Sequence, residues 1–496
     1  MLIDGIGGIS RGLLSKALLP SEVCSASLRR IKTTRDLNAY ITVTEEYARV
    51  RAGQGDKRCE AGKMLPLDGV TVAVKDNFCT AGTRTTCASS MLHQFVPQYT
   101  ATVVERLEQA GAIIVGKTNL DEFAMGAGAT DSMFGPSKNP WRYESANDAL
   151  EGDFYITGGS SGGSAVAVAS GTCFGAVGSD TGGSVRNPSV RCGVPALKPS
   201  YGALSRHGLI PLTHSLDSPG LIALRIDDLA TFFFICVGKD SRDPTTIDTS
   251  KYFAAKDLQL DSTPTWNGLK VGIPQEYFCP GMQDEVVNLW RDVADLMAKQ
   301  GAKVVPVSLP HTQYSLQCYS VINCCDVASN LACYDGLEYG CRADNMSSIE
   351  SLFADTRSEG FSETVRGRIL CGNYFLLREN YDKYFRQAMR LRRLIKDDFT
   401  RVFEQVDLLL APVTLTEAVL YSEWVKKDNR TRTVLEDYCT QPANLAGLPA
   451  LSLPCRLSRK GLPLGLQLIG PYLSELRLLS AAKRLEMEMD FQHSCK

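Results

Sequence analysis

The sequence predicts an α/β protein, a single large domain with a mixed central β-sheet covered by helices on both faces. A helical segment, a glycine and an apolar strand follow one another at residues 101–115, and the same order recurs at residues 285–307. Strand-like segments then recur at residues 407–413, 451–454 and 464–469. Helices and strands that alternate in this way are typical of a sheet with helices packed on both sides.

No composition shift or linker divides the 496 residues, so we expect one domain over residues 1–496. An N-terminal helical segment is expected over about residues 1–35, and a C-terminal helix over about residues 474–490. Between them, residues 38–43 are strand-like and residues 45–62 form a polar helix that ends in glycine.

The composition is that of a globular protein, with 44% hydrophobic and 22% charged residues. A net charge of −2 argues against a polyanion-binding surface over the whole chain, although a local basic patch is compatible with it. The chain has no run of 18 apolar residues, so no membrane association is expected. Its 17 cysteines show neither a secreted-type pattern nor paired zinc spacing, which indicates free thiols in a reducing compartment.

Two Gly-Ser clusters dominate residues 157–188. Four glycines surround Ser160 in the first cluster, and Gly182 and Gly183 precede Ser184 in the second. Glycines allow successive backbone N–H groups to converge on one point, which suits an oxyanion hole beside a nucleophilic hydroxyl. The apolar residues between the clusters argue against a flexible linker. The segment therefore predicts acyl-transfer chemistry.

Lys75 ends the apolar, β-branched segment 69–74. Lysine is rarely buried without a role, and burial lowers its pKa, so that it can remove a proton from a serine. A lysine at the end of a strand that extends its amine to solvent is the structural alternative. The co-occurrence of Lys75, Ser160 and Ser184 favours a base, a relay and a nucleophile.

Residues 111–118 match the P-loop formula letter for letter. In a P-loop the strand precedes the first glycine and a helix follows the lysine. Here a helix precedes, and the residues between the glycines are strand-like. We therefore do not expect a nucleotide site at this segment.

Residues 158–162 match the nucleophile-elbow formula, which requires a histidine later in the chain. Four histidines qualify by position: His207, His214, His311 and His493. A Ser-His hydrolase is therefore an alternative that the sequence leaves open.

Four segments resemble the amidase signature family: VKDN (74–77), GGSSGGS (158–164), GSDTGGSVR (178–186) and LKPSYG (197–202). The resemblance implies the amidase fold and places Ser184 as nucleophile, Ser160 as a bridging serine after a cis peptide bond, and Lys75 as base. It also implies an oxyanion hole formed by Thr181, Gly182 and Gly183 together with Ser184 itself.

Within this family the chain is most similar to the glutamine-hydrolysing subunits of glutamyl-tRNA(Gln) amidotransferases of the mitochondrial type, through the segments 116–126, 205–211, 215–220 and 441–454. The resemblance implies that L-glutamine is held by Tyr319, Arg368 and Asp437. A guanidinium suits the α-carboxylate and a carboxylate suits the α-ammonium. Taken individually, Arg368 and Asp437 would more often be ordinary charges on a helix surface.

The resemblance further implies two partner subunits, B and C, and contact with Glu-tRNA(Gln) mainly through the complex. ATP and Mg²⁺ would be used by a partner, and this chain would need no cofactor or metal of its own. The expected location is the mitochondrial matrix, with a bacterial-type cytoplasm as the alternative.

The chain departs from the family at two positions, since Thr157 replaces a usual proline and Pro195 lies in a segment that is usually Val-Val-Gly. Neither position supplies a catalytic atom. The remaining alternatives are a stand-alone amidase or esterase that uses the same three residues, and a catalytically silent scaffold.

Overall fold

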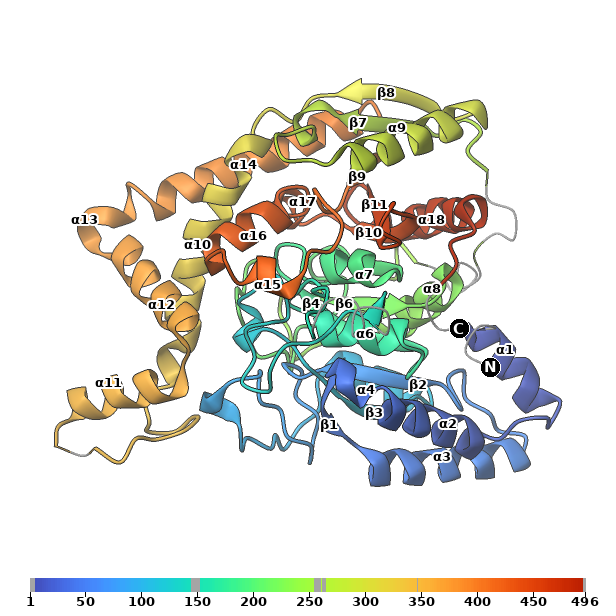
Figure 1. Ribbon diagram of the computed structural model, residues 1–496, viewed down its shortest axis with the longest axis horizontal. Coiled ribbons are helices and arrows are strands. Elements are labelled where there is room, and N and C mark those ends of the chain that lie inside the picture. The colour runs from blue at the N-terminus through green and yellow to red at the C-terminus, as the bar shows by residue number, and fades with distance from the viewer. Residues whose placement is uncertain (1–4, 144–151, 254–259, 261–264, 346, 494–496) are drawn as a thin grey trace.

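A computed structural model describes residues 5–143, 152–253, 260, 265–345 and 347–493 (Figure 1). Its strands form one sheet in the order β1-β3-β2-β4-β6-β5-β10-β11-β9-β7-β8. The strands are β1 (Tyr40–Val43), β2 (Thr71–Lys75), β3 (Ile113–Thr118), β4 (Gly175–Asp180), β5 (Ala196–Lys198), β6 (Ser218–Ala223), β7 (Lys270–Pro274), β8 (Lys303–Val307), β9 (Leu408–Pro412), β10 (Ala450–Leu457) and β11 (Pro463–Ile469).

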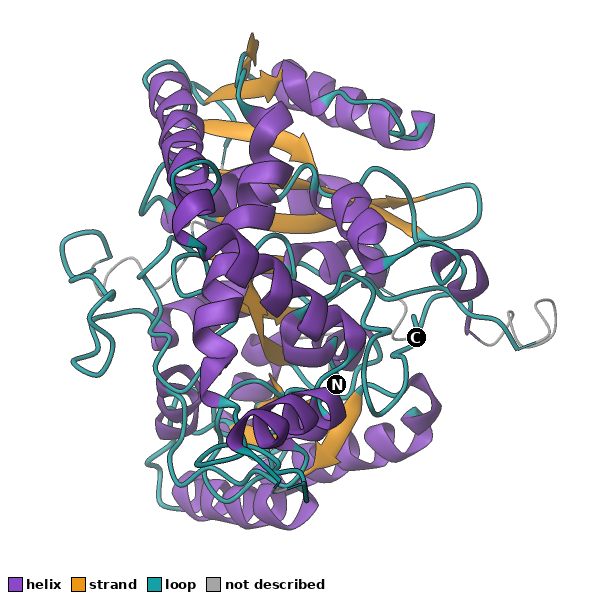
Figure 2. Ribbon diagram, turned by 90° about the vertical axis from the view of Figure 1, so that its left-hand side faces the viewer, coloured by secondary structure: helices purple, strands orange, loops and turns teal. Residues whose placement is uncertain are grey.

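The sheet is mixed. β2 runs parallel to β3 and β4, and β7 runs parallel to β8 and β9, whereas the central strands from β4 to β11 pair in antiparallel fashion. Figure 2 shows the strands passing through the middle of the molecule with helices on either side.

The helices are α1 (Gly5–Leu14), α2 (Pro20–Thr33), α3 (Glu45–Glu60), α4 (Thr102–Gln109), α6 (Gly162–Ala169), α7 (Arg186–Cys192), α8 (Ile226–Cys236), α9 (Asp284–Lys299), α10 (Ser315–Asn330), α11 (Ile349–Gly360), α12 (Glu363–Leu376), α13 (Arg378–Tyr381), α14 (Phe385–Phe403), α15 (Tyr421–Trp424), α16 (Asn429–Asp437), α17 (Gln441–Ala446) and α18 (Glu475–Met489). None of the helices in the described residues is both long enough and apolar enough to cross a membrane.

Alternation along the strands divides the core into two layers. Val72 and Val74 of β2 belong to one apolar cluster and Ala73 belongs to another, because successive side chains of a strand point to opposite faces. The first cluster includes residues of α4, α8 and α18, and the second includes residues of α2, α3 and α6. The predicted mixed sheet with helices on both faces is therefore confirmed.

The predicted order of helix, glycine and strand also occurs in the structure. Gly111, with a φ of +103°, follows α4 and precedes β3, and Gly301, with a φ of +100°, lies between α9 and β8. Glycine adopts such positive φ angles without the steric cost that a Cβ atom would add. Each glycine thus lets the chain reverse from a helix into the next strand.

Helices α10 to α14 extend to one side of the sheet, at the left of Figure 1. α10 packs against α12 and α14, and α14 packs against α17. This helical region brings Tyr319 on α10 and Arg368 on α12 to the edge where the Ser184 turn lies.

Residues 111–118 form no phosphate-binding loop. The segment is mostly the buried strand β3, and Lys117 Nζ forms an ion pair with Asp76 Oδ1 at 3.1 Å. The same Nζ donates hydrogen bonds to Phe78 O and Thr85 Oγ1. These contacts give Lys117 a structural role within the described residues.

Candidate active site

Lys75 is the last residue of β2, and its side chain is completely buried. Its Nζ lies 2.7 Å from Ser160 Oγ, 2.9 Å from Ser161 Oγ and 3.0 Å from Ser179 Oγ. Three hydroxyl groups thus fix the amine at hydrogen-bonding distance from the serine expected to relay a proton.

Burial lowers the pKa of Lys75 to about 7, against the opposing attraction of the carboxylates of Asp121, Asp180 and Asp217. A substantial fraction of Lys75 is therefore a neutral amine near neutral pH, with a lone pair that can accept a proton from Ser160. This is the protonation state that a general base requires.

Ser160 follows a cis peptide bond, Gly159–Ser160, at the position that the family resemblance implies. A Cβ atom on Gly159 would lie 2.3 Å from Asp121 Oδ2 and 2.6 Å from Ala129 N, so no larger residue fits there. Asp121 in turn accepts hydrogen bonds from the backbone N–H groups of Ala129, Thr130 and Asp131. Asp121 and the loop of residues 129–131 therefore pack against Gly159, directly before Ser160.

Ser184 lies in the turn between β4 and α7, and its backbone O accepts a hydrogen bond from Ser161 N at 3.0 Å. This bond joins the two Gly-Ser clusters directly. Lys75 and Ser160 are fully buried, whereas Ser184 is 9% exposed. Of the three predicted catalytic residues, Ser184 is therefore the one that a substrate can reach.

The backbone N–H groups of Thr181, Gly182, Gly183 and Ser184 donate to no acceptor within the part of the chain that the structure describes. The turn is nevertheless held firmly, because Thr181 Oγ1 donates to Asp217 at 2.7 Å and Gly182 O accepts from Thr440 Oγ1 at 2.6 Å. An oxyanion hole requires backbone N–H groups that are free to donate and are held in a fixed position, and the N–H groups of residues 181–184 meet both conditions.

A buried ion pair fixes the two ends of this turn. Arg186 Nε and Nη2 donate to the two carboxylate oxygens of Asp180, each at 3.1 Å. Burial alone would raise the pKa of Asp180, but the Arg186 guanidinium outweighs it and lowers that pKa to about 2. Arg186 also donates to the backbone O of Thr440, so the same guanidinium ties the turn to the segment before α17.

A cavity of about 720 Å³ opens beside the turn and is lined by Tyr319, Arg368 and Gln441, among others. The Tyr319 ring packs against Gly182, since a Cβ atom on that glycine would lie 3.1 Å from the ring. Arg368 donates to the side-chain oxygens of Asn323 at 3.0 Å and Asn429 at 3.3 Å. No carboxylate of the described residues forms an ion pair with Arg368, so its charge is available to a ligand.

Asp437 is a buried carboxylate at the end of α16, with an exposed fraction of 5%. Its Oδ1 has no hydrogen-bond partner among the described residues, and it lies 3.0 Å from the position of a Cβ atom on Gly183. Burial raises the pKa of Asp437 well above its usual value. The empty site therefore favours the neutral carboxyl group, and a cationic ligand beside Oδ1 would stabilise the charged carboxylate.

The structure thus groups the predicted catalytic, oxyanion and substrate-binding residues around one turn and one cavity. Sequence reasoning missed Ser179, Asp121 and Thr440 as contributors. Ser179 lies within the segment 178–186, but nothing local indicates that its hydroxyl faces Lys75. Asp121 and Thr440 act through approaches that exist only in the folded chain. Among the described residues, no group of three or more His, Cys, Asp or Glu side chains is arranged to hold a metal ion.

None of the four candidate histidines forms a hydrogen bond with Ser160 or Ser184 in the described parts of the chain. His207 packs against Tyr99, His214 contacts Arg206, His311 pairs with Asp398, and His493 lies 3.0 Å from Gly193 O. Lys75 is the group that contacts Ser160. The geometry therefore favours the lysine as base over the Ser-His alternative.

The mixed sheet with helices on both faces is the fold of an amidase. The chain matches the Amidase family over residues 22–479, and it belongs to that family. The resemblance inferred from the sequence is therefore confirmed.

Two relatives in sequence and one solved structure show which members of the family the chain is similar to. It is 58% identical over 479 residues to the A subunit of mitochondrial glutamyl-tRNA(Gln) amidotransferase of Ixodes scapularis, a match that covers 96% of this chain and 94% of that protein. The Xenopus tropicalis protein of the same name is 53% identical over 486 residues, with 95% and 92% covered. The crystal structure of the A subunit of glutamyl-tRNA(Gln) amidotransferase from Thermotoga maritima has a TM-score of 0.75 and 34% identity, and the match covers 95% of this chain and 92% of that one.

Proposed function

We propose that this protein hydrolyses glutamine as the ammonia-generating subunit of a glutamyl-tRNA(Gln) amidotransferase. One observation carries the choice of substrate. Within the described residues, the Arg368 guanidinium in the cavity beside the Ser184 turn has no ion-pair partner, and the Asp437 carboxyl group that adjoins the same turn has an Oδ1 atom without a hydrogen-bond partner. These two charges are complementary to the α-carboxylate and α-ammonium of an amino acid. A neutral amide would leave both without a partner.

The contacts at the site support the following reaction. Ser184 Oγ attacks the side-chain amide carbon, while its proton passes through Ser160 to the neutral amine of Lys75. The oxyanion accepts hydrogen bonds from the free N–H groups of residues 181–184. The proton returns to the leaving nitrogen, so ammonia departs and a γ-glutamyl ester remains on Ser184. Water activated by the same relay then cleaves the ester and releases glutamate.

The names of the relatives support an assembly in mitochondria, and we place this chain in the matrix. In the proposed complex, subunits B and C complete the enzyme, and the ammonia passes to the partner that amidates Glu-tRNA(Gln). ATP and Mg²⁺ are used by that partner, and this chain needs neither a metal nor an organic cofactor. The reaction described above requires only side chains, backbone N–H groups and water.

Ammonia release from glutamine, measured with and without the partner subunits, ATP and Glu-tRNA(Gln), tests the proposal. We expect release from glutamine in the complex and appearance of Gln-tRNA(Gln). A chain that hydrolyses simple uncharged amides faster than glutamine would instead be a stand-alone amidase.

Asp437→Asn should lower kcat/KM for glutamine much more than for an amide that lacks the α-ammonium group. The substitution removes the negative charge that faces the ammonium but keeps the shape of the side chain. A charge-assisted hydrogen bond contributes about 1.5–3 kcal/mol, so a loss of about 10- to 100-fold is expected for glutamine. Equal losses for the two substrates would show that Asp437 has only a structural role.

The kcat/KM for glutamine should rise with pH and level off above an inflection near 7, because only the neutral form of Lys75 accepts a proton. Asp121→Asn should move the inflection to lower pH, since its carboxylate raises the pKa of Lys75. A profile that falls with rising pH across this range would contradict the base role.

His207→Ala and His214→Ala should leave glutamine turnover within about twofold of the original rate, because neither ring contacts the serines. Steady-state kinetics of the two variants provide the measurement. A loss of a hundredfold or more in either variant would restore the Ser-His alternative, since removing a general base costs about 10²–10⁴-fold.

A further inference from the structure

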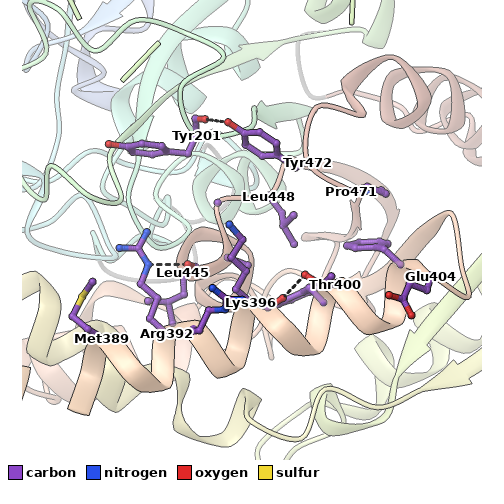
Figure 3. A pocket seen from close by; sticks show the side chains of 15 residues that line it. Tyr201, Met389, Arg392, Lys396, Thr400, Glu404, Leu445, Leu448, Pro471 and Tyr472 are labelled. Atoms are coloured by element: carbon purple, nitrogen blue, oxygen red, sulfur yellow. Dashed lines mark hydrogen bonds between the residues drawn. The ribbon is translucent and has the colours of Figure 1, made fainter. Parts of the chain in front are cut away.

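A second cavity, of about 650 Å³, is not used by the proposed reaction (Figure 3). It lies between α14, the end of α17 and the segments that contain Tyr201 and Tyr472. Helix α17 contributes Gln441 to the cavity beside Ser184 and residues 445–446 to this one. The two cavities are therefore distinct, although one helix lines both.

Two cations on the α14 wall of this cavity, Arg392 and Lys396, form no ion pair with a carboxylate of the described residues. Arg392 donates from Nε to Leu445 O at 2.9 Å and from Nη2 to Ser215 O at 2.8 Å, and neither acceptor is charged. Burial lowers the pKa of Arg392, but a guanidinium stays protonated in proteins. Lys396, one turn further along the helix, is exposed and forms no ion pair with any described residue. Arg393 on this wall is neutralised by Asp397 at 2.7 Å.

The opposite wall is aromatic. Figure 3 shows Tyr201 and Tyr472 across the cavity from Arg392 and Lys396. The Tyr201 hydroxyl donates to His214 O at 2.7 Å and the Tyr472 hydroxyl donates to Tyr201 O at 2.9 Å. Both hydroxyls are occupied. The Arg206 guanidinium lies over one face of the Tyr201 ring, which leaves a ligand the other face and the exposed ring of Tyr472. Phe403 adds a further ring from α14, whereas Phe399 is fully buried and stacks against Phe403.

The cavity is elongated along α14. Arg392 and Glu404 both line it and are twelve residues apart, which corresponds to about 18 Å along a helix. The cations lie towards one end, aromatic rings lie between, and the Glu404 carboxylate lies at the other end. A small dicarboxylate such as glutamate could contact the cations but would leave the aromatic rings uncovered and would not reach Glu404.

We propose that this cavity binds a nucleoside phosphate, with the phosphate on Arg392 and Lys396 and the base on the aromatic rings. Arginine and lysine are the usual partners of phosphate, and bases stack on tyrosine and phenylalanine. Glu404 accepts hydrogen bonds from ribose hydroxyls or from an exocyclic amino group. The same chemistry is offered by a free nucleotide and by the unpaired terminal nucleotide of an RNA. The site is independent of the proposed hydrolysis of glutamine.

Isothermal titration calorimetry with the full chain, in its complex where that is available, tests the proposal with AMP as the probe. Lys396→Glu is the informative variant, because Lys396 makes no contact that the fold needs, whereas Arg392 holds two backbone segments. Arg390→Glu is the matched control, since it makes the same charge change on the same helix at an exposed residue outside the cavity. Glutamine turnover of both variants reports whether the fold is intact.

We expect saturable AMP binding that weakens about tenfold or more in Lys396→Glu and changes by less than about twofold in Arg390→Glu. Adenosine, which lacks the phosphate, and inorganic phosphate, which lacks the nucleoside, should each bind at least about tenfold more weakly than AMP. Absence of saturable AMP binding, equal losses in the two variants, or binding of phosphate or glutamate as tight as that of AMP would each overturn the proposal.

A short single-stranded RNA that ends in adenosine distinguishes the two sources of this chemistry. If the RNA displaces AMP and binds more tightly, the ligand is an RNA end. If AMP binds more tightly than the RNA, the ligand is a free nucleotide. In either case the RNA and AMP must compete for the same cavity, and the Lys396→Glu variant must bind the tighter of the two ligands more weakly than the unsubstituted protein does.

Discussion

Ser184→Ala is expected to lower glutamine hydrolysis by about six orders of magnitude, because a nucleophile that acts in a coupled unit cannot be replaced by its neighbours. Ser160 is the other serine of the predicted relay, but it is fully buried and at hydrogen-bonding distance from Lys75. The stability of the variant should change by less than about 1 kcal/mol, since the substitution removes one small hydroxyl group that makes no hydrogen bond with the described residues and is 9% exposed.

Ser189→Ala is the matched control for this change. Ser189 lies on α7 close to Ser184, is fully buried, and its hydroxyl has no hydrogen-bond partner among the described residues. Its removal should preserve both the fold and the activity. Retention of even a tenth of the original activity in Ser184→Ala would refute the nucleophile assignment.

Lys75→Met is expected to lower turnover by about 10³-fold or more, because it removes the amine that accepts the proton from Ser160. Lys75→Arg should be equally inactive, since a guanidinium does not deprotonate. Steady-state ammonia release measures both variants. An active Lys75→Arg enzyme would exclude the base role.

Lys117 provides a control that separates the effect of replacing any buried lysine from the effect of removing the catalytic base. It lies on the neighbouring strand β3 and is fully buried like Lys75, but it forms an ion pair with Asp76. Lys117→Met should therefore destabilise the fold by about 3–5 kcal/mol, because it leaves a buried carboxylate without its partner. Thermal unfolding should therefore show a larger loss of stability for Lys117→Met than for Lys75→Met. Ammonia release should show that Lys75→Met loses activity beyond what its loss of stability explains.

The sequence predicts those parts of the fold that depend on residues close together in the chain. Helices, strands and the glycines between them follow from short sequence patterns, as at Gly111 and Gly301. The order of the strands does not follow from such patterns. Strand β5, for example, is only three residues long and lies between β6 and β10, so it is defined by its pairing with distant segments. The helical region α10 to α14, which carries Tyr319 and Arg368, likewise has no local pattern that divides it into its elements.

The candidate site divides in the same way. The Gly-Ser clusters and a lysine at a strand end indicate Lys75, Ser160 and Ser184 by their residue types alone. The assignments of Arg368 and Asp437 depend on the family resemblance, since a single charge on a helix has no distinctive pattern. The positions of the histidines relative to Ser160 and Ser184 require the folded chain.

The most direct test of the account is the site of covalent labelling during turnover. Protein that is quenched with acid while it hydrolyses glutamine, then digested and analysed by mass spectrometry, should carry one γ-glutamyl group on Ser184. The label should be absent in Ser184→Ala and in samples without glutamine. A γ-glutamyl group on Ser160 or on a cysteine, with Ser184 unmodified, would contradict the mechanism proposed for this site.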